Sequence, residues 1–115
     1  MADLEALTHL IQSFIKDRDW NQFHNPKDLA ISLDLEAAEV LEHFQWKNDT
    51  EITKYIKTNK KDISEELADV LYWVLLMSSN LNIDIDEAFR EKMKRNELKY
   101  PISKSRGNHS KYTEL

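Results

Sequence analysis

The chain of 115 residues contains no cysteine, two prolines and a single glycine, Gly107. Without cysteine it cannot form disulfides, iron–sulfur clusters, thiolate zinc sites or a catalytic thiol. With one glycine it cannot build the phosphate-binding loops of Rossmann and Walker A motifs, or the nucleophile elbow of many hydrolases. Few turn-forming residues, together with many Leu, Glu, Lys and Ala, predict an all-helical protein.

Charge and hydropathy exclude further classes. The chain carries 16 Lys+Arg against 21 Asp+Glu, for a formal net charge of −5, which argues against a nucleic-acid polymer as partner. Its longest apolar run, residues 70–77, is far shorter than the roughly 20 residues that cross a bilayer. The first residues lack the basic and apolar regions of a signal peptide. We therefore expect a cytoplasmic protein that does not contact membranes.

Helical spacing of apolar residues predicts a first helix over residues 3–18, followed by a loop that ends at Asn25. Asn25 and Pro26 form an N-cap and first-turn pair, so a second helix should begin there and run to about Trp46. A short third helix is expected near residues 52–58.

Two further helices are indicated by acidic residues three positions apart. Asp62 with Glu65 is typical of a capping box and predicts a fourth helix that ends near residue 81. Asp84 with Glu87 predicts a fifth helix that ends near residue 100. We expect one four- to five-helix bundle domain over residues 1–101, and a mobile or partner-docked tail over residues 102–115.

The apolar run at residues 70–77 covers every side of the fourth predicted helix. Such a helix must be buried all round, and a chain of this size can cover it only in part. We therefore expect a homodimer or a homotetramer.

Acidic pairs occur on two predicted helices. Glu36 and Glu39 are three residues apart and share a face with core-type leucines, and Glu66 and Asp69 repeat this pattern. If the two helices pack antiparallel, four carboxylates converge. Their mutual repulsion predicts a hard divalent cation with oxygen ligands, Mg²⁺ or alternatively Mn²⁺.

Two alternatives stay open at this point. In the first alternative the acids are ordinary surface charge on a non-catalytic helical oligomerisation or interaction module, because exposed acidic pairs are common. The other alternative is a di-metal carboxylate bundle of the oxidase type, which needs a Glu-x-x-His motif on two helices. His43 lies four residues after Glu39 and does not complete that motif.

The sequence resembles the MazG-like all-α nucleotide pyrophosphohydrolases, and within them the dCTP pyrophosphatase branch. The four acids match an E-x-x-E and E-x-x-D signature, and the likeness spans about residues 10–115. Further matching segments are residues 18–24, 36–46, 65–71 and 111–115, with Lys92, Met93, Asn96, Tyr100 and Pro101.

The resemblance implies an enzyme, a hydrolase that converts a nucleoside triphosphate, usually a deoxy one, and water to a monophosphate and diphosphate. It also implies Mg²⁺ dependence and a role in cleaning the nucleotide pool. Glu36, Glu39, Glu66 and Asp69 would be the metal ligands. Either Glu36 or Glu39 would accept the proton of the attacking water, and two or more Mg²⁺ ions would bridge carboxylates and phosphates.

The resemblance also implies substrate contacts. The nucleobase would meet aromatic and polar residues, namely Trp20, Asn21, Phe23, His24, Trp46 and Trp73. Phosphate contacts would come from the last long helix, at Lys92, Asn96, Lys99 and Tyr100. The mammalian relatives have tyrosine at the position of Trp73 and histidine at the position of Ile11, so the substrate is either dCTP or several dNTPs.

Overall fold

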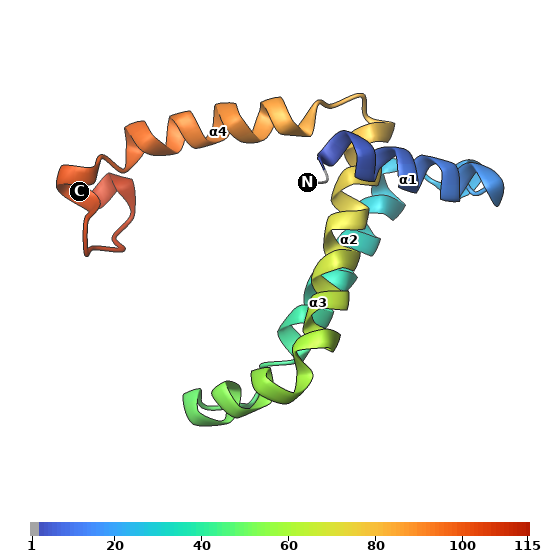
Figure 1. The fold of residues 1–115 in the computed structure, drawn as a ribbon. Coiled ribbons are helices and arrows are strands. Elements are labelled where there is room, and N and C mark those ends of the chain that lie inside the picture. The colour runs from blue at the N-terminus through green and yellow to red at the C-terminus, as the bar shows by residue number, and fades with distance from the viewer. Residues whose placement is uncertain (1–2) are drawn as a thin grey trace. The chain divides into compact units, whose positions relative to one another are not determined.

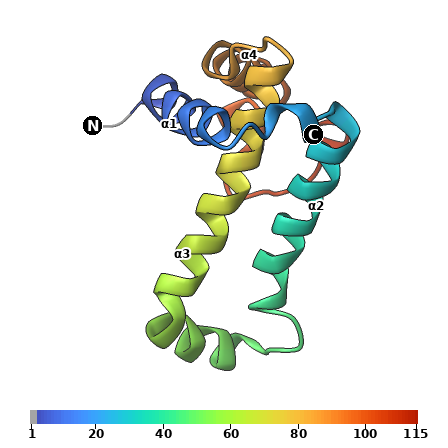
Figure 2. The ribbon, with the colours of Figure 1, turned by 90° about the vertical axis from the view of Figure 1, so that its right-hand side faces the viewer.

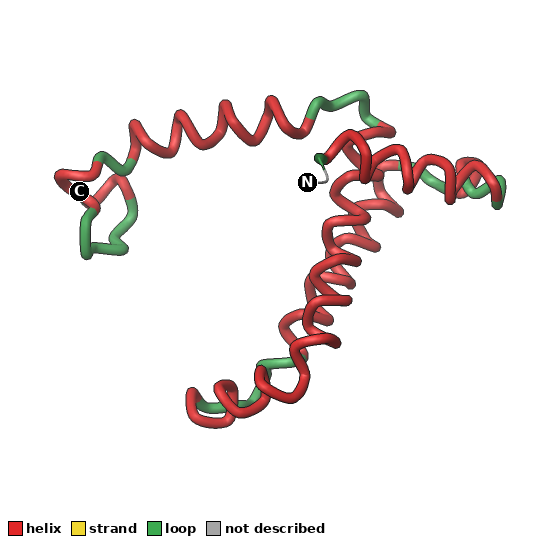
Figure 3. Tube along the Cα trace, viewed as in Figure 1, coloured by secondary structure: helices red, strands yellow, loops and turns green. Residues whose placement is uncertain are grey.

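The computed structural model describes residues 3–115, and every regular element within them is helical (Figure 3). The all-α prediction is therefore confirmed. The chain order is α1 (Leu4–Asp17), α2 (Pro26–Glu42), α3 (Asp49–Asn80), α4 (Ile85–Lys99) and α5 (Ile102–Ser105), with short 3₁₀ turns at Asn21–Phe23 and Tyr112–Glu114. The chain divides after Asn82 into two compact units, each of which is described by itself.

In the first unit α2 and α3 run antiparallel side by side, and α1 crosses α3 near its C-terminal end (Figures 1 and 2). The buried core lies at this crossing and consists of Ile11, Ile15, Leu29, Leu75 and Leu76. The Gln12 amide of α1 donates a hydrogen bond of 2.7 Å to Ser79 Oγ of α3. The middle of the α2–α3 pair is thus left outside the main core.

Polar side chains start the helices as the sequence predicts. The Asp3 carboxylate accepts from the backbone N–H of Ala6 at the start of α1, at 2.8 Å. At the start of α2, Asn25 Oδ1 accepts from the N–H of Asp28 at 2.9 Å, with proline in the first turn. Each bond satisfies a backbone donor that has no partner within its helix.

The second helix is shorter than predicted and ends at Glu42. The four residues that follow form a turn, and Trp46 has a φ of +69°, which does not continue a helix. The turn is held by His43 Nδ1, which lies 2.5 Å from the Tyr55 hydroxyl, and by Lys47 Nζ, which donates to the His43 carbonyl at 2.7 Å. The chain therefore reverses four residues earlier than apolar spacing suggests.

The predicted third and fourth helices are one helix, α3, so the predicted break between them is wrong. The capping box lies at Asn48 and Glu51, and Asp62 lies inside the helix. Asn59 alone departs from helical geometry, with φ −121° and ψ 18°, and its amide donates to the Tyr55 carbonyl at 3.1 Å. That bond replaces a backbone partner at the kink, so the chain bends without ending the helix.

Residues 70–77 are only partly covered within one chain. Leu75 and Leu76 are each 2% exposed, whereas Leu71 is 40% exposed and Leu67, one turn earlier, is 54% exposed. One side of α3 therefore packs against α1 and α2, and another side presents leucine to its surroundings.

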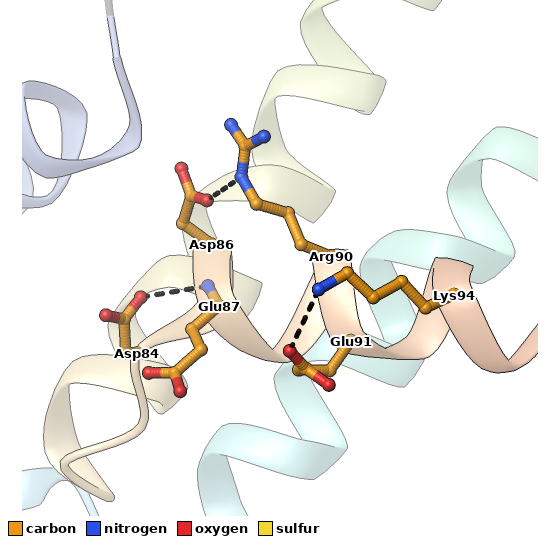
Figure 4. Close-up of polar contacts among 6 residues, drawn as sticks. All are labelled: Asp84, Asp86, Glu87, Arg90, Glu91 and Lys94. Carbon is orange, nitrogen blue, oxygen red and sulfur yellow. Dashed lines mark hydrogen bonds and ion pairs between the residues drawn. The ribbon is translucent and has the colours of Figure 1, made fainter.

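The second unit consists of α4, α5 and the final 3₁₀ turn. Figure 4 shows the start of α4, where the Asp84 carboxylate accepts from the N–H of Glu87 at 3.1 Å. Arg90 pairs with the carboxylate one turn earlier, at Asp86, and Lys94 pairs with Glu91 at 3.5 Å. The predicted start of α4 is confirmed. The predicted tail contains two short helical turns, at residues 102–105 and 112–114.

Within residues 3–115 no helix combines the length and the apolar character that a bilayer crossing requires.

Candidate metal centre

Four carboxylates meet at the middle of the α2–α3 pair. Glu36 and Glu39 come from α2, and Glu66 and Asp69 come from α3. One oxygen of each residue lies within 4.8 Å of the corresponding oxygens of the other three. The antiparallel pairing seen in Figure 2 is what makes two i, i+3 pairs converge. The predicted acidic residues are thus brought together.

The two inner members of this cluster are incompletely hydrogen-bonded. Glu36 Oε2 and Glu66 Oε2 are both buried and have no hydrogen-bond partner within residues 3–115. A buried carboxylate oxygen without a partner is costly, and a bound cation is one of the few groups that satisfies it. Glu39 and Asp69 are exposed, so the cluster opens to solvent on one side. The residues therefore fit a hard divalent cation that keeps some water ligands.

Repulsion within the cluster appears in its proton affinities. The pKa of Glu66 is raised to about 7, first by a hydrogen bond with the Glu39 carboxyl, then by burial and by the charges of Glu39, Asp69 and Glu36. Burial, the Glu39 carboxyl and the charge of Asp69 raise the pKa of Glu36, and a hydrogen bond from Trp73 opposes this. Without a cation, the cluster retains protons near neutral pH.

Aromatic side chains lie next to the acids. Trp73 follows Asp69 by one helical turn, and its ring meets the edge of His24 at a centroid distance of 6.2 Å. His24 ends the 3₁₀ turn that Asn21 begins, and its Nδ1 atom is buried without a hydrogen-bond partner in the part of the chain that the structure describes. Trp20 is 41% exposed and lies at 5.5 Å, edge to face, from Phe14. Three of the predicted base contacts thus lie around the α1–α3 crossing.

Two other predicted base contacts are highly exposed. Phe23 is 64% exposed in the 3₁₀ turn, and Trp46 is 91% exposed on the turn after α2. Trp46 also has a φ of +69°, a left-handed backbone conformation that is uncommon for a bulky residue. Neither side chain belongs to the buried core.

The predicted phosphate contacts belong to the second unit. Lys92 is exposed on α4, and the Asn96 amide lies 3.8 Å from Met93 Sδ. Lys99 Nζ lies 4.8 Å from the centroid of the Tyr112 ring, which also meets Tyr100 edge to face at 6.0 Å. The C-terminal end of α4 and the tail therefore share one local cluster.

Sequence reasoning missed two residues beside the candidate site. Phe14 follows Ile11 by three residues in the first predicted helix, at core-type spacing, yet it is 40% exposed and contacts Trp20 and Tyr72. Tyr72 was expected only as part of an apolar run, yet its ring lies 5.0 Å from that of Trp73. The sequence offered two signals for these contacts: Tyr72 is adjacent to Trp73, and Phe14 lies six residues before Trp20.

A family model described as the MazG-like family matches residues 31–115. The chain belongs to the MazG-like family. The resemblance inferred from the sequence is thereby confirmed, and the matched region includes all four acids of the cluster.

Similar proteins agree with this assignment. The dCTP pyrophosphatase 1 of Mus musculus is 38% identical over 114 residues, which cover 97% of this chain and 67% of the relative. The protein of that name from Homo sapiens is 36% identical with the same coverage. The crystal structure of a pyrophosphatase from Archaeoglobus fulgidus superposes with a TM-score of 0.81 at 37% identity, covering 88% of this chain and 94% of that one.

The raised pKa of Glu66 makes the stability of the metal-free protein depend on pH. Its folded value of about 7 lies above the ordinary 4.5, so its contribution is fully present below pH 4.5 and is lost as pH rises through 7. Urea unfolding in EDTA should therefore give a free energy that falls between pH 5 and about 7.5. Excess Mg²⁺ should raise it again at the upper end.

The matched control for this pH dependence is Glu66→Gln, which cannot titrate and should show a flatter profile. Identical slopes for the two proteins would contradict the assignment of the raised pKa to Glu66.

Proposed function

We propose that this chain is a metal-dependent (deoxy)nucleoside triphosphate pyrophosphohydrolase that converts a (d)NTP and water to a (d)NMP and diphosphate. The observation that carries the proposal is the group of four carboxylates within 4.8 Å, contributed by two antiparallel helices of a MazG-like chain. The relatives named dCTP pyrophosphatase 1 support a deoxynucleotide substrate and a role in cleaning the nucleotide pool. The substrate is dCTP or several dNTPs.

The metal is Mg²⁺, with Mn²⁺ as the alternative, held by Glu36, Glu39, Glu66 and Asp69. All four donors are carboxylate oxygens, which hard cations prefer. His43 is engaged with the Tyr55 hydroxyl, so it does not add the nitrogen ligand that a di-iron site of the Glu-x-x-His type needs. The orphaned oxygens of Glu36 and Glu66 are the inner ligands.

Divalent cations at this site would neutralise phosphate charge and acidify a coordinated water. Glu39 is exposed on the open side of the cluster, where it can accept the proton of the attacking water. The water oxygen bonds to the α-phosphorus, and the bond from that phosphorus to the oxygen bridging to the β-phosphorus breaks. Diphosphate leaves with the bond electrons. Glu36, being more buried, keeps the ligand geometry and serves as the alternative base.

The nucleobase lies against the aromatic side chains that adjoin the acids. Trp20 and Trp73 offer ring surface for stacking, and the unpartnered Nδ1 of His24 offers a hydrogen bond to the base edge. Asn21 and Phe23, on the same 3₁₀ turn, and Trp46 complete the contacts. Phosphate contacts by Lys92, Asn96, Lys99 and Tyr100 follow from the family resemblance, and the two lysines carry the positive charge that the acidic cluster lacks.

We also propose that the chain works in the cytoplasm as a homodimer or homotetramer. Leucines are exposed on both paired helices, with Leu35 at 60%, Leu41 at 63% and Leu67 at 54%. Large exposed apolar surfaces on paired helices favour association with a second copy.

The activity is tested by measuring diphosphate released from dCTP, dATP, dUTP and dTTP with Mg²⁺. Wild type should release it, and Glu39→Gln should lower kcat by about 100-fold or more, the range for loss of a general base. The melting temperature of Glu39→Gln in EDTA should not fall, because a repulsive carboxylate is removed. Glu42→Gln, an exposed acid of the same helix, is the matched control.

Each failure of this assay has a distinct meaning. If no nucleotide yields diphosphate, the enzyme assignment fails and the alternative of a non-catalytic oligomerisation or interaction module is favoured. Iron retained through purification would instead support the di-metal oxidase-type bundle. A sharp drop in the apo melting temperature of Glu39→Gln would make Glu39 a structural residue.

Trp46→Ala should raise KM for dCTP more than it lowers kcat, because it removes ground-state stacking rather than transition-state stabilisation. Trp46→Phe retains an aromatic ring at this position, so its KM for dCTP should lie between those of wild type and Trp46→Ala. An unchanged KM in Trp46→Ala would remove this residue from the base contacts.

Self-association is tested by light scattering coupled to gel filtration. The double substitution Leu67→Lys with Leu71→Lys should lower the measured mass, since it buries charge in the proposed interface. Glu65→Lys changes charge on the same helix and should leave the mass unaltered. A wild type that elutes at 13.6 kDa, the mass of one chain, would contradict the proposal.

A further inference from the structure

Five rings form a continuous series of edge-to-face contacts across the first unit. Trp20 meets Phe14 at 5.5 Å and 78°, and Phe14 meets Tyr72 at 6.4 Å and 88°. Tyr72 then meets Trp73 at 5.0 Å and 84°, and Trp73 meets His24 at 6.2 Å and 82°. Because each pair is nearly perpendicular, the orientation of one ring constrains that of the next.

Arg18 also holds Phe14 in place, through a contact with its ring and a hydrogen bond to its backbone. The guanidinium carbon lies 3.9 Å from the centroid of the Phe14 ring, and Nη1 donates to the Phe14 carbonyl at 3.0 Å. Phe14 is nevertheless 40% exposed, so it is held by these contacts rather than by the core. Burial raises the pKa of the Tyr72 hydroxyl, and the positive charge of Arg18 partly opposes this rise, which agrees with the position of Arg18 beside this series.

Tyr72 occupies the central place in the series. It is half-buried on α3 and is the only residue of the series to contact both Phe14, from α1, and Trp73, its own neighbour in sequence. Within this series, Trp20 and Trp73 are therefore connected only through Phe14 and Tyr72. Removing the Tyr72 ring would uncouple them.

We propose that Tyr72 is a positioning residue for nucleotide binding: its ring fixes the orientation of Trp73 and, through Phe14, that of Trp20. This rests on the proposed function, in which both tryptophans contact the base. An aliphatic side chain fills similar space but provides no ring edge, so it leaves each tryptophan free to reorient. Base binding then weakens because rotamer freedom must be lost on association.

The test compares Tyr72→Leu with Tyr72→Phe in the full chain, by steady-state kinetics with dCTP and Mg²⁺. Tyr72→Leu should raise KM by about fivefold or more, a fraction of the stacking contribution, with a smaller change in kcat. Tyr72→Phe keeps both ring edges and should restore a KM close to wild type. Phe14→Leu, which breaks the series one ring earlier, should raise KM in the same direction.

A general loss of stability is separated from positioning by Ile15→Val, which removes a methyl group from a residue that is 1% exposed. This variant should lower the melting temperature while KM stays unchanged. A KM for Tyr72→Leu equal to that of wild type would overturn the proposal. So would an equally raised KM in Tyr72→Phe, because the hydroxyl rather than the ring would then be responsible.

Near-ultraviolet circular dichroism without nucleotide tests the structural half independently of catalysis. The Tyr72–Trp73 contact should give a tryptophan band that Tyr72→Leu loses and Tyr72→Phe keeps. If wild type hydrolyses no nucleotide, the proposed function fails. The band still tests whether Tyr72 fixes the orientation of Trp73. A band unchanged in Tyr72→Leu would overturn the positioning itself.

Discussion

The electrostatic repulsion among four carboxylates is the constraint on which the rest of this structure depends. One carboxylate oxygen from each of Glu36, Glu39, Glu66 and Asp69 lies within 4.8 Å of those of the other three, and these four acids contribute to the chain's net charge of −5. Hydrophobic burial elsewhere must hold the two helices together against this repulsion. The core supplies it at the α1–α3 crossing, with Ile15 and Leu75 buried, so stability is concentrated at one end of the unit and the charged cluster lies beyond it.

The scarcity of glycine explains both how the chain turns and how it handles phosphate. Three connections between helical elements contain non-glycine residues with positive φ, namely Asp19, Trp46 and Asn82. Asp and Asn tolerate this region, whereas tryptophan does so at a strain of about 1–3 kcal/mol. A backbone with so few open turns cannot wrap amide groups around a phosphate. Carboxylates with a bound cation are another way to hold a triphosphate, and the cluster has the donors for it.

Much of this was predictable because it depends on local spacing. The Asn25 cap, the all-helical class and the convergence of two i, i+3 acidic pairs follow from period and capping chemistry alone. The end of α2 at Glu42 was not, because apolar residues continue past it and the His43–Tyr55 contact that holds the turn joins distant positions. The polar run that begins near Asn59 predicts the end of a helix. The Asn59 amide instead bonds to the Tyr55 carbonyl, and α3 continues.

The spacing of the site along α3 bears on how it could discriminate substrates. Asp69 and Trp73 are four residues apart, so the helix sets their separation along its axis at about 6 Å. The distance from the acidic cluster to this aromatic side chain therefore varies little, whatever the base. What remains adjustable is the orientation of the rings, and that is governed by contacts such as Tyr72 with Trp73. Nucleobase preference in such a site depends on side-chain packing around a fixed helical frame. The acids therefore indicate the reaction but do not determine which nucleobase is preferred.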